Sequence, residues 1–484
     1  MRRCSASWLA LFFGLAGCSL IPDYHRPELP VASHWSDGAD AAPVGSQRSA
    51  ADLGWRDFFA DPVAQELIAL SLANNRDLRV AALNVAQAQA QYRADRAGLF
   101  PTIDANAGLT RSVIPGDVSG FGTTAPVSIR DYSLGLGVVS WELDLFGRIR
   151  SQARQAEETY LSDAETQLST QISLVAEVSS AYLTWLADRD ALAVSQDTVK
   201  AQADSLRLTQ LKVAHGSATA QDVAQAETTL RSAEASAAQF TRQVAQDMDE
   251  VVFLVGTPLP EELQARMNAE RGLDREPTFP DLPAGLPADL LERRPDIRAA
   301  EHTLMGANAN IGAARAAFFP KISLTTNGGV ASSGLSHLFG PGHGSWTFEP
   351  TVTVPIFDAG QNFANLDIAK IEARTEIADY EKTIQSAFHD VSDALAARST
   401  YASQLAAERA LVDADGRFYH LADMRFRAGV DTYLNVLIAQ NSLFSAQLTL
   451  INLKLTTMQN AVTLYKALGG GWQEHSTQAS VVGR

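Results

Sequence analysis

The chain has 484 residues, with 39 Lys and Arg against 55 Asp and Glu, and a net charge of −16. This acidic balance argues against nucleic acid as a partner, because phosphate binding needs clustered basic side chains. Hydrophobic residues make up 46% of the chain, which is enough for a large core, and its two cysteines are too few for a disulfide framework. After the N-terminus, no stretch approaches about 18 consecutive apolar residues, so the sequence predicts no membrane-spanning helix but leaves open a β-barrel.

The N-terminus has the pattern of a secretory signal. A short basic segment precedes an apolar segment that is too short to span a membrane, and small residues then lead to Cys18. The end of this segment resembles a bacterial lipobox, which implies that Cys18 is acylated and becomes the first residue of the mature chain. We predict a signal peptide over residues 1–17 and a lipid-anchored N-terminal arm over 18–62. An ordinary signal peptide with an incidental cysteine is the alternative.

The sequence that follows is an internal duplication. The phrase RAGLFPTI at 96–103 recurs as RAAFFPKI at 315–322. The similarity extends back over 77–103, whose residues match those of 296–322 at many positions. Several of the identical pairs are alanines in an alanine-rich chain, so the Arg, Phe and Pro pairs carry the evidence for a repeat.

The spacing of helix-breaking residues repeats as well. The segment 148–215 has no Gly or Pro and precedes Gly216, and the segment 361–428, which has one Gly, precedes Gly429. A further segment without breakers follows each of these glycines, at 217–255 and at 430–468, and each ends at another glycine. We therefore predict a first repeat at 63–256, a Pro-rich equatorial connection at 257–288, a second repeat at 289–469 and a C-terminal tail at 470–484.

The segments without breakers predict long helices. They are rich in Ala, Gln, Glu, Leu and Arg, which favour helix formation. Apolar residues recur at intervals of seven, a spacing typical of helices packed nearly parallel, as at Leu192, Val199, Leu206 and Val213. A helix that spans all of 148–215 would be about 100 Å long. Small residues on both flanks favour a position within a wall of helices over a coiled coil with one seam.

Two strands are predicted in each half, before the long helix. Their ranges are 101–111, 131–141, 321–330 and 345–357. In the last, Trp346, Phe348 and Val352 alternate with threonines and Glu349, as in transmembrane β-strands. Four strands cannot close a barrel in lipid, so strands that span a membrane would require several copies of the chain.

Six further motifs accompany these elements along the chain. They are Ile21–Pro27, Trp55–Phe59, the paired Phe-Pro motifs, Trp141–Gly147, Arg293–Glu301 and Val354–Gly360. Together they resemble the TolC-type outer-membrane efflux proteins, most closely the lipoprotein branch that contains OprM and NodT. The resemblance covers almost the whole mature chain.

The resemblance implies a mainly α protein with membrane β-strands. The expected assembly is a homotrimeric duct in which a long α-helical barrel continues into a 12-stranded outer-membrane β-barrel, four strands per subunit, with a mixed α/β equatorial region. The duct would be anchored in the outer membrane and extend into the periplasm. Its expected partners are outer-membrane lipid, a periplasmic adaptor and an inner-membrane pump of the proton-driven RND type.

The resemblance also implies a gate where the helical hairpins turn, at 214–220 and 428–433. Gly216 and Gly429 supply residues that tolerate positive φ in these turns. The gate candidates near the turns are Asp222, Arg425, Phe426, Arg427, Asp431, Leu434, Asn435, Ile438 and Asn441.

Several of these positions depart from the family's pattern. Phe426 stands where TolC has a Tyr, Asp431 where it has an Arg, and Asn435 where it has an Asp. We therefore expect an aperture poor in charge, with a hydrophobic constriction near Leu434 and Ile438 that gates by dewetting. A ring of acidic side chains around Asp222 is the alternative, and solvated charge near a helix end is the simplest interpretation of each charged residue.

The sequence predicts no enzyme and no cofactor. It contains no zinc-binding pattern, nucleophile elbow or phosphate-binding loop. We expect passive conduction of drugs or other small molecules that a pump delivers. The alternatives are a duct for protein or peptide secretion, and a periplasmic coiled-coil lipoprotein that forms no channel.

Overall fold

A computed structural model describes residues 19–32, 35, 50–118, 122, 124–269, 272–274, 279–280, 282 and 290–476. Cys18, the predicted acylation site, lies outside the described residues. In chain order the elements are η2 (Ala50–Asp52), α1 (Trp55–Phe58), α2 (Pro62–Asn74), α3 (Arg76–Ala97), β1 (Asp104–Ile114), β2 (Val127–Glu142), α4 (Arg148–Ala214), α5 (Ala220–Val255), α6 (Glu261–Ala269), η3 (Gly272–Asp274), α7 (Leu290–Arg293), α8 (Pro295–Ala316), β3 (Lys321–Ser332), η5 (Leu335–His337), β4 (Gly344–Thr353), α9 (Gln361–Arg427) and α10 (Tyr433–Ala467).

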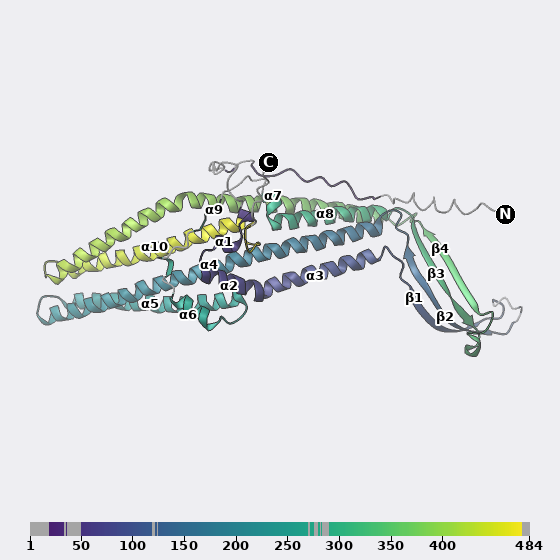
Figure 1. Ribbon diagram of the computed structural model, residues 1–484, viewed down its shortest axis with the longest axis horizontal. Helices are drawn as coiled ribbons and strands as arrows, with labels where there is room; N and C mark the ends of the chain where they lie inside the picture. The colour runs from purple at the N-terminus through teal and green to yellow at the C-terminus, as the bar shows by residue number, and fades with distance from the viewer. Residues whose placement is uncertain are drawn as a thin grey trace. The chain divides into compact units, whose positions relative to one another are not determined.

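The long helices form as predicted, in two pairs (Figure 1). Helices α4 and α9 have 67 residues each and occupy equivalent places in the two halves of the chain. Helices α5 and α10, with 36 and 35 residues, follow them. The helices are this long because α4 contains no Gly or Pro and α9 contains only Gly416. Each of them ends two residues before a glycine, at Ala214 and Arg427.

Backbone contacts divide the chain into two units. Unit 1 takes in the chain up to Glu28 with Asn84–Asp163 and Ala299–Tyr380, and unit 2 takes in Leu29–Leu83, Ala164–Arg298 and Glu381–Arg484. Helices α3, α4, α8 and α9 contribute residues to both units.

Unit 1 contains the four-stranded antiparallel sheet, in the order β1-β2-β3-β4 (Figure 1). All four predicted strands are present, but β4 ends at Thr353, so Val354 and Ile356 lie beyond it. Pro350 pairs with Leu324 within β4.

The N-terminal arm packs along α8 within unit 1. Arg315 donates to the Leu20 carbonyl at 3.1 Å, and Asn308 donates to the Pro22 carbonyl at 2.8 Å. A Cβ atom on Gly312 would lie 2.6 Å from Ile21 Cγ1, so the arm occupies space that only a glycine leaves.

Further along the arm, Tyr24 and Arg26 bind Glu301 of α8, which is 6% exposed. Arg26 donates two hydrogen bonds to it, both at 2.8 Å, and the Tyr24 hydroxyl donates a third at 3.1 Å. Bidentate pairing with a guanidinium is a strong form of the carboxylate ion pair. Glu301, Asn308 and Arg315 are seven residues apart, so they lie along one stripe of the helix.

Unit 2 contains α5, α10, the C-terminal parts of α4 and α9, and the short helices α1, α2, α6 and α7. Its aromatic core is centred on Phe58, whose ring stacks on Tyr465 with centroids 4.0 Å apart and on Phe279 at 5.1 Å. The Tyr465 hydroxyl donates to the Leu53 carbonyl. The N-terminal half of the chain is therefore joined to the last turns of α10.

The C-terminal segment pairs with the start of α1. The amides of Trp55 and Arg56 donate to the carbonyls of Gln473 and Glu474, and the Arg56 side chain binds the Glu474 carboxylate at 2.7 Å. The described residues of the expected equatorial region form helices joined by this short backbone pairing.

By length and composition, one described helix could cross a membrane: α10, with a mean hydropathy of 1.2 over its most apolar 18 residues. Polar residues such as Asn435 and Gln440 interrupt its apolar sequence, so the chain has no uninterrupted apolar stretch of about 18 residues here. Tyr433, Val436 and Leu437 of α10 are buried within unit 2, and such burial is also typical of a helix in a protein core.

Candidate functional site

The predicted gate residues lie at the two hairpin turns, both in unit 2. In the first turn Gly216 has φ 74°, its amide donates to the Val213 carbonyl, and the Ser217 amide donates to the Lys212 carbonyl at 2.8 Å. These two bonds form a Schellman motif, which closes the end of a helix through a left-handed residue.

The second turn has the same backbone hydrogen bonds at the duplicated positions. Gly429 has φ 74°, its amide donates to the Phe426 carbonyl, and the Val430 amide donates to the Arg425 carbonyl at 3.0 Å. The duplication therefore preserved the backbone of the turn, although the side chains around it differ.

Asp222 begins α5 as part of a capping box with Thr219. The Thr219 amide donates to the Asp222 carboxylate at 2.8 Å, and the Asp222 amide donates to the Thr219 hydroxyl oxygen at 3.2 Å. The hydrogen bonds that the Thr219 amide and hydroxyl donate to its carboxylate lower the pKa of Asp222, so it stays ionised near neutral pH. Its position thus has a local explanation within its own hairpin.

The second hairpin uses Asp431 instead. Its carboxylate accepts hydrogen bonds from the Thr432 amide at 2.8 Å, from Arg425 at 3.1 Å and from Asn435 at 2.7 Å. These donors, led by the Thr432 amide, lower the pKa of Asp431. The structure therefore brings three of the predicted gate residues together in one exposed network at the second turn.

Arg427 lies apart from that network. It pairs with Asp423 one helical turn earlier, at 2.7 Å, and its side chain is 62% exposed. An exposed pair of this kind contributes little to stability.

Phe426 was expected at the aperture, but it is buried in the contact between the two hairpins, with 4% exposed. Its ring lies 5.6 Å from that of Tyr433. Six other buried residues complete this tip cluster: Ala226, Ala422, Tyr433, Val436, Leu437 and Ala439. Leu206, Leu208 and Tyr419 pack against it, so all four hairpin helices contribute.

The remaining candidates share an exposed face of α10. Leu434 is 58% exposed and Ile438 49% exposed, and Asn435 and Asn441 are exposed as well. Leu434, Ile438 and Asn441 are spaced four and then three residues apart, which places them on one side of the helix. This side of the protomer is available to line an opening or to meet another copy.

Lys212 belongs to the same site, although no motif in the sequence selected it. Its ammonium donates to the Phe426 carbonyl at 2.5 Å and lies 3.5 Å from the centroid of the Phe426 ring. A lysine near the end of α4 was visible in the sequence, but its partner in the other half of the chain was not.

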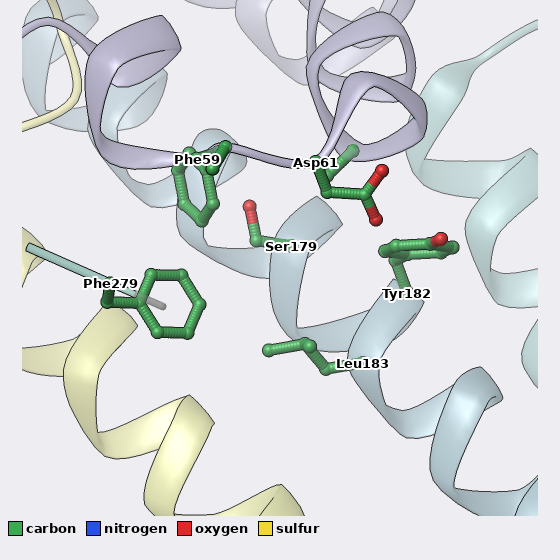
Figure 2. A pocket seen from close by; sticks show the side chains of 8 residues that line it. Phe59, Asp61, Ser179, Tyr182, Leu183 and Phe279 are labelled. Atoms are coloured by element: carbon green, nitrogen blue, oxygen red, sulfur yellow. The ribbon is translucent and has the colours of Figure 1, made fainter. Parts of the chain in front are cut away.

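A cavity elsewhere in unit 2 is too small for a ligand. Figure 2 shows Ser179, Tyr182 and Leu183 of α4 around a cavity near Phe59 and Phe279. Its volume is about 10 Å³, which is near the minimum for one water molecule. Among the residues that the structure describes, no group of three or more His, Cys, Asp or Glu side chains could hold a metal ion.

Comparison with known proteins gives one family. The family described as "Outer membrane efflux protein" matches residues 67–257 and 286–470. The antibiotic efflux pump outer membrane protein ArpC of Pseudomonas putida is 50% identical over 481 residues, covering 99% of this chain and 98% of its own. The toluene efflux pump outer membrane protein TtgC of P. putida has the same identity and coverage.

A solved structure has the same fold. The crystal structure of the open state of the Neisseria gonorrhoeae MtrE outer membrane channel superimposes with a TM-score of 0.85 at 38% identity. The match covers 95% of this chain and 100% of that one.

Proposed function

The chain belongs to the outer membrane efflux protein family and is the outer-membrane channel of an efflux pump, and we propose that it works as a homotrimer gated at its hairpin tips. Channel proteins of this kind conduct passively, so the chain is not an enzyme. The proposal concerns the number of subunits, the transported compounds, the partners and the gate.

The open edges of the sheet are the observation that supports an assembly of several copies. Strands β1 and β4 end the sheet order, so each has one paired neighbour in the sheet. An open edge is not tolerated in the hydrocarbon region of a membrane, because its amide and carbonyl groups would lack partners. Pairing β1 of one copy with β4 of the next closes the sheet, and the three copies that the resemblance to TolC-type proteins implies give a barrel of 12 strands, within the known range.

Small apolar or amphiphilic compounds are the proposed cargo. The relatives named for an antibiotic pump and for a toluene pump are equally similar to this chain, which supports a permissive duct. We assign the choice of compound, and the energy for transport, to a proton-driven inner-membrane pump of the RND type that is joined through a periplasmic adaptor.

The N-terminal arm supports anchoring at Cys18. The arm residues that follow this cysteine are held along α8 by Arg315, Asn308 and Glu301. The bond from Arg315 holds Leu20, two residues after Cys18, near the end of α8 that leads into β3. We therefore propose that residues 1–17 are removed and that acylated Cys18 joins the outer-membrane leaflet.

The gate is proposed at the exposed face of α10. Leu434 and Ile438 would form the hydrophobic constriction, and Asp222 is the residue on which the acidic alternative depends. The test is the reversal potential of purified channels in a bilayer separating unequal KCl concentrations. Asp222→Asn can retain the Thr219 cap but removes the charge, whereas Asp222→Ala removes both. Unchanged ion selectivity in both variants supports the hydrophobic constriction, and a loss of cation selectivity in both supports the acidic ring.

Two experiments test the channel function itself. Discrete single-channel currents are expected from the purified trimer, and their absence would leave the non-channel lipoprotein as the better hypothesis. Deletion of the gene should lower resistance to antibiotics and solvents. Unchanged resistance together with a missing secreted protein would favour the secretion duct.

A further inference from the structure

Lys212 connects two parts of the protomer that are far apart in sequence. It lies in the last turn of α4, and its ammonium reaches the Phe426 carbonyl, near the last residue of α9. The first hairpin thus holds the second through one side chain at the tips, where both helices end.

The acceptor suits a cation for two reasons. The last carbonyls of a helix carry the negative end of its dipole, so a cation placed there is stabilised. The Phe426 ring lies 3.5 Å from the same ammonium, which adds a cation–π contact. Because Phe426 is buried in the tip cluster, its carbonyl and its ring are both held in place.

A second polar contact crosses between the hairpins within the same cluster. The hydroxyl of Tyr433 in α10 donates to Gln202 Oε1 in α4 at 3.2 Å, and both residues are buried. Tyr433 also packs against Phe426, so the two contacts share their hydrophobic surroundings.

The buried polar side chains on the same face of α4 as Gln202 form hydrogen bonds within α4 itself. Ser195, Gln202 and Thr209 are seven residues apart and at most 1% exposed. The hydroxyls of Ser195 and Thr209 donate to carbonyls four residues earlier in α4 itself, at 2.8 Å. Moving a neighbouring helix away from them would leave these hydrogen bonds intact, so they offer little resistance to separation of the hairpins.

The duplication does not reproduce the Lys212 contact. Arg425 is the counterpart of Lys212 in the second hairpin, since each stands four residues before the glycine of its turn. Arg425 donates to Asp431 in its own turn. Lys212 therefore binds the other hairpin of the same protomer, whereas Arg425 binds the turn of its own hairpin.

We propose that Lys212 is a latch that holds the two hairpin tips of one protomer together and so opposes channel opening, with the Tyr433–Gln202 hydrogen bond as a second, weaker latch. This proposal rests on gating at the tips, because a latch matters only if the hairpins separate. Lys212 acts as a positioning residue: it fixes Phe426, which packs against Tyr433 at the start of α10, from which Leu434 and Ile438 project.

The test compares Lys212→Met, which keeps the length of the side chain, with Lys200→Met as a matched control. Lys200 lies on the same helix, is 75% exposed and pairs with Asp197. Spin labels at His215→Cys and Val430→Cys report the distance between the two turns, in trimers where labelled protomers are diluted. The two natural cysteines, Cys4 and Cys18, precede all of the described residues. Channel opening is measured in parallel, as KCl conductance in bilayers.

Lys212→Met should broaden the distance distribution and raise the open probability about tenfold, since a hydrogen bond from a charged group and a cation–π contact are both lost. Lys212→Arg should restore the parent behaviour, because guanidinium can donate to the carbonyl and stack on the ring. Tyr433→Phe should change both readouts in the same direction by a smaller factor. Lys200→Met should change neither.

Unchanged distances in Lys212→Met trimers that remain assembled would overturn the latch, as would an equal effect in the Lys200→Met control. A failure of Lys212→Arg to restore the parent distances would also overturn it. If the parent trimer carries no current, gating at the tips fails, but the distance measurement still decides whether Lys212 holds the hairpins together.

Discussion

Replacing Gly216 by alanine isolates the cost of one backbone conformation. Gly216 has φ 74°, and a Cβ atom placed on it would have no neighbour within 4 Å. The substitution therefore introduces no clash, and its effect comes from the left-handed conformation, which costs an L-residue about 1–2 kcal/mol. Gly429 has the same φ and the same open surroundings, so the same cost is expected at the second turn.

Hydrogen exchange at the turns measures this cost directly. The amides of Gly216 and Ser217 exchange when the Schellman bonds to Val213 and Lys212 open. A loss of about 1 kcal/mol corresponds to roughly fivefold faster exchange of these amides. Gly216→Asn should have a much smaller effect, since asparagine tolerates the left-handed region better than alanine does.

Gly416 provides the matched control. It lies inside α9, and a Cβ atom there would also meet nothing within 4 Å. Because alanine favours a helix over glycine by about 1 kcal/mol, Gly416→Ala should slow exchange in its own segment. If Gly216→Ala exchanges as slowly as the parent, or if both substitutions act in the same direction, the reasoning from φ is wrong.

Three further predictions concern other parts of the chain. Glu301→Gln should let chymotrypsin cleave after Tyr24 about tenfold faster, because two hydrogen bonds from a charged Arg26 are weakened; unchanged cleavage would show that the arm is held elsewhere. Gly312→Val should also speed this cleavage, since its Cβ would lie 2.6 Å from Ile21 Cγ1. Gly306 should tolerate alanine, because the nearest neighbour of a Cβ atom there would be 3.5 Å away. Burial and the neighbouring Asp188 raise the pKa of Asp247 to about 7. The folded protein therefore holds a proton that the unfolded chain releases near pH 4, so stability falls as pH rises towards 7. Asp247→Asn should raise the melting temperature at pH 8 and change it little at pH 4, and an equal rise at both values would contradict the assignment.

The helices and strands could be predicted from the sequence because their signals are local. The absence of breakers predicted α4 and α9 to within a residue of their observed ends. The alternation of Trp346, Phe348 and Val352 predicted β4, although the prediction continued past its end at Thr353. That error came from counting Val354 and Ile356, which continue the pattern on either side of a proline.

The buried face of α4 was harder to predict. The heptad series Leu192, Val199, Leu206 and Val213 was expected to be the packed face, but these residues are half-buried. The fully buried positions are three residues further on, where Ser195 and Thr209 lie. Small hydroxyl side chains can be buried because carbonyls of their own helix accept their hydrogen bonds. A pattern of hydrophobic residues cannot reveal a buried face that contains such polar side chains.

The site showed a similar limit. The Thr219–Asp222 capping box could have been recognised from its spacing, which is the ordinary signal for the start of a helix. Burial of Phe426 and its contact with Lys212 could not, because both depend on how one hairpin packs against the other. The place of Arg26 on Glu301 likewise joins residues 275 positions apart.

The two hairpin turns show how a duplicated gene can divide labour between its copies. Each turn is closed by main-chain hydrogen bonds and one glycine, so its shape does not depend on the other side chains. Lys212 and Arg425, and likewise Asp222 and Asn435, therefore differ between the two hairpins although the backbone of the turn is the same. Exchanging residues 215–219 with 428–432 should therefore give a chain that still folds, but Arg425 should lose its hydrogen bond to Asp431, which moves with its loop.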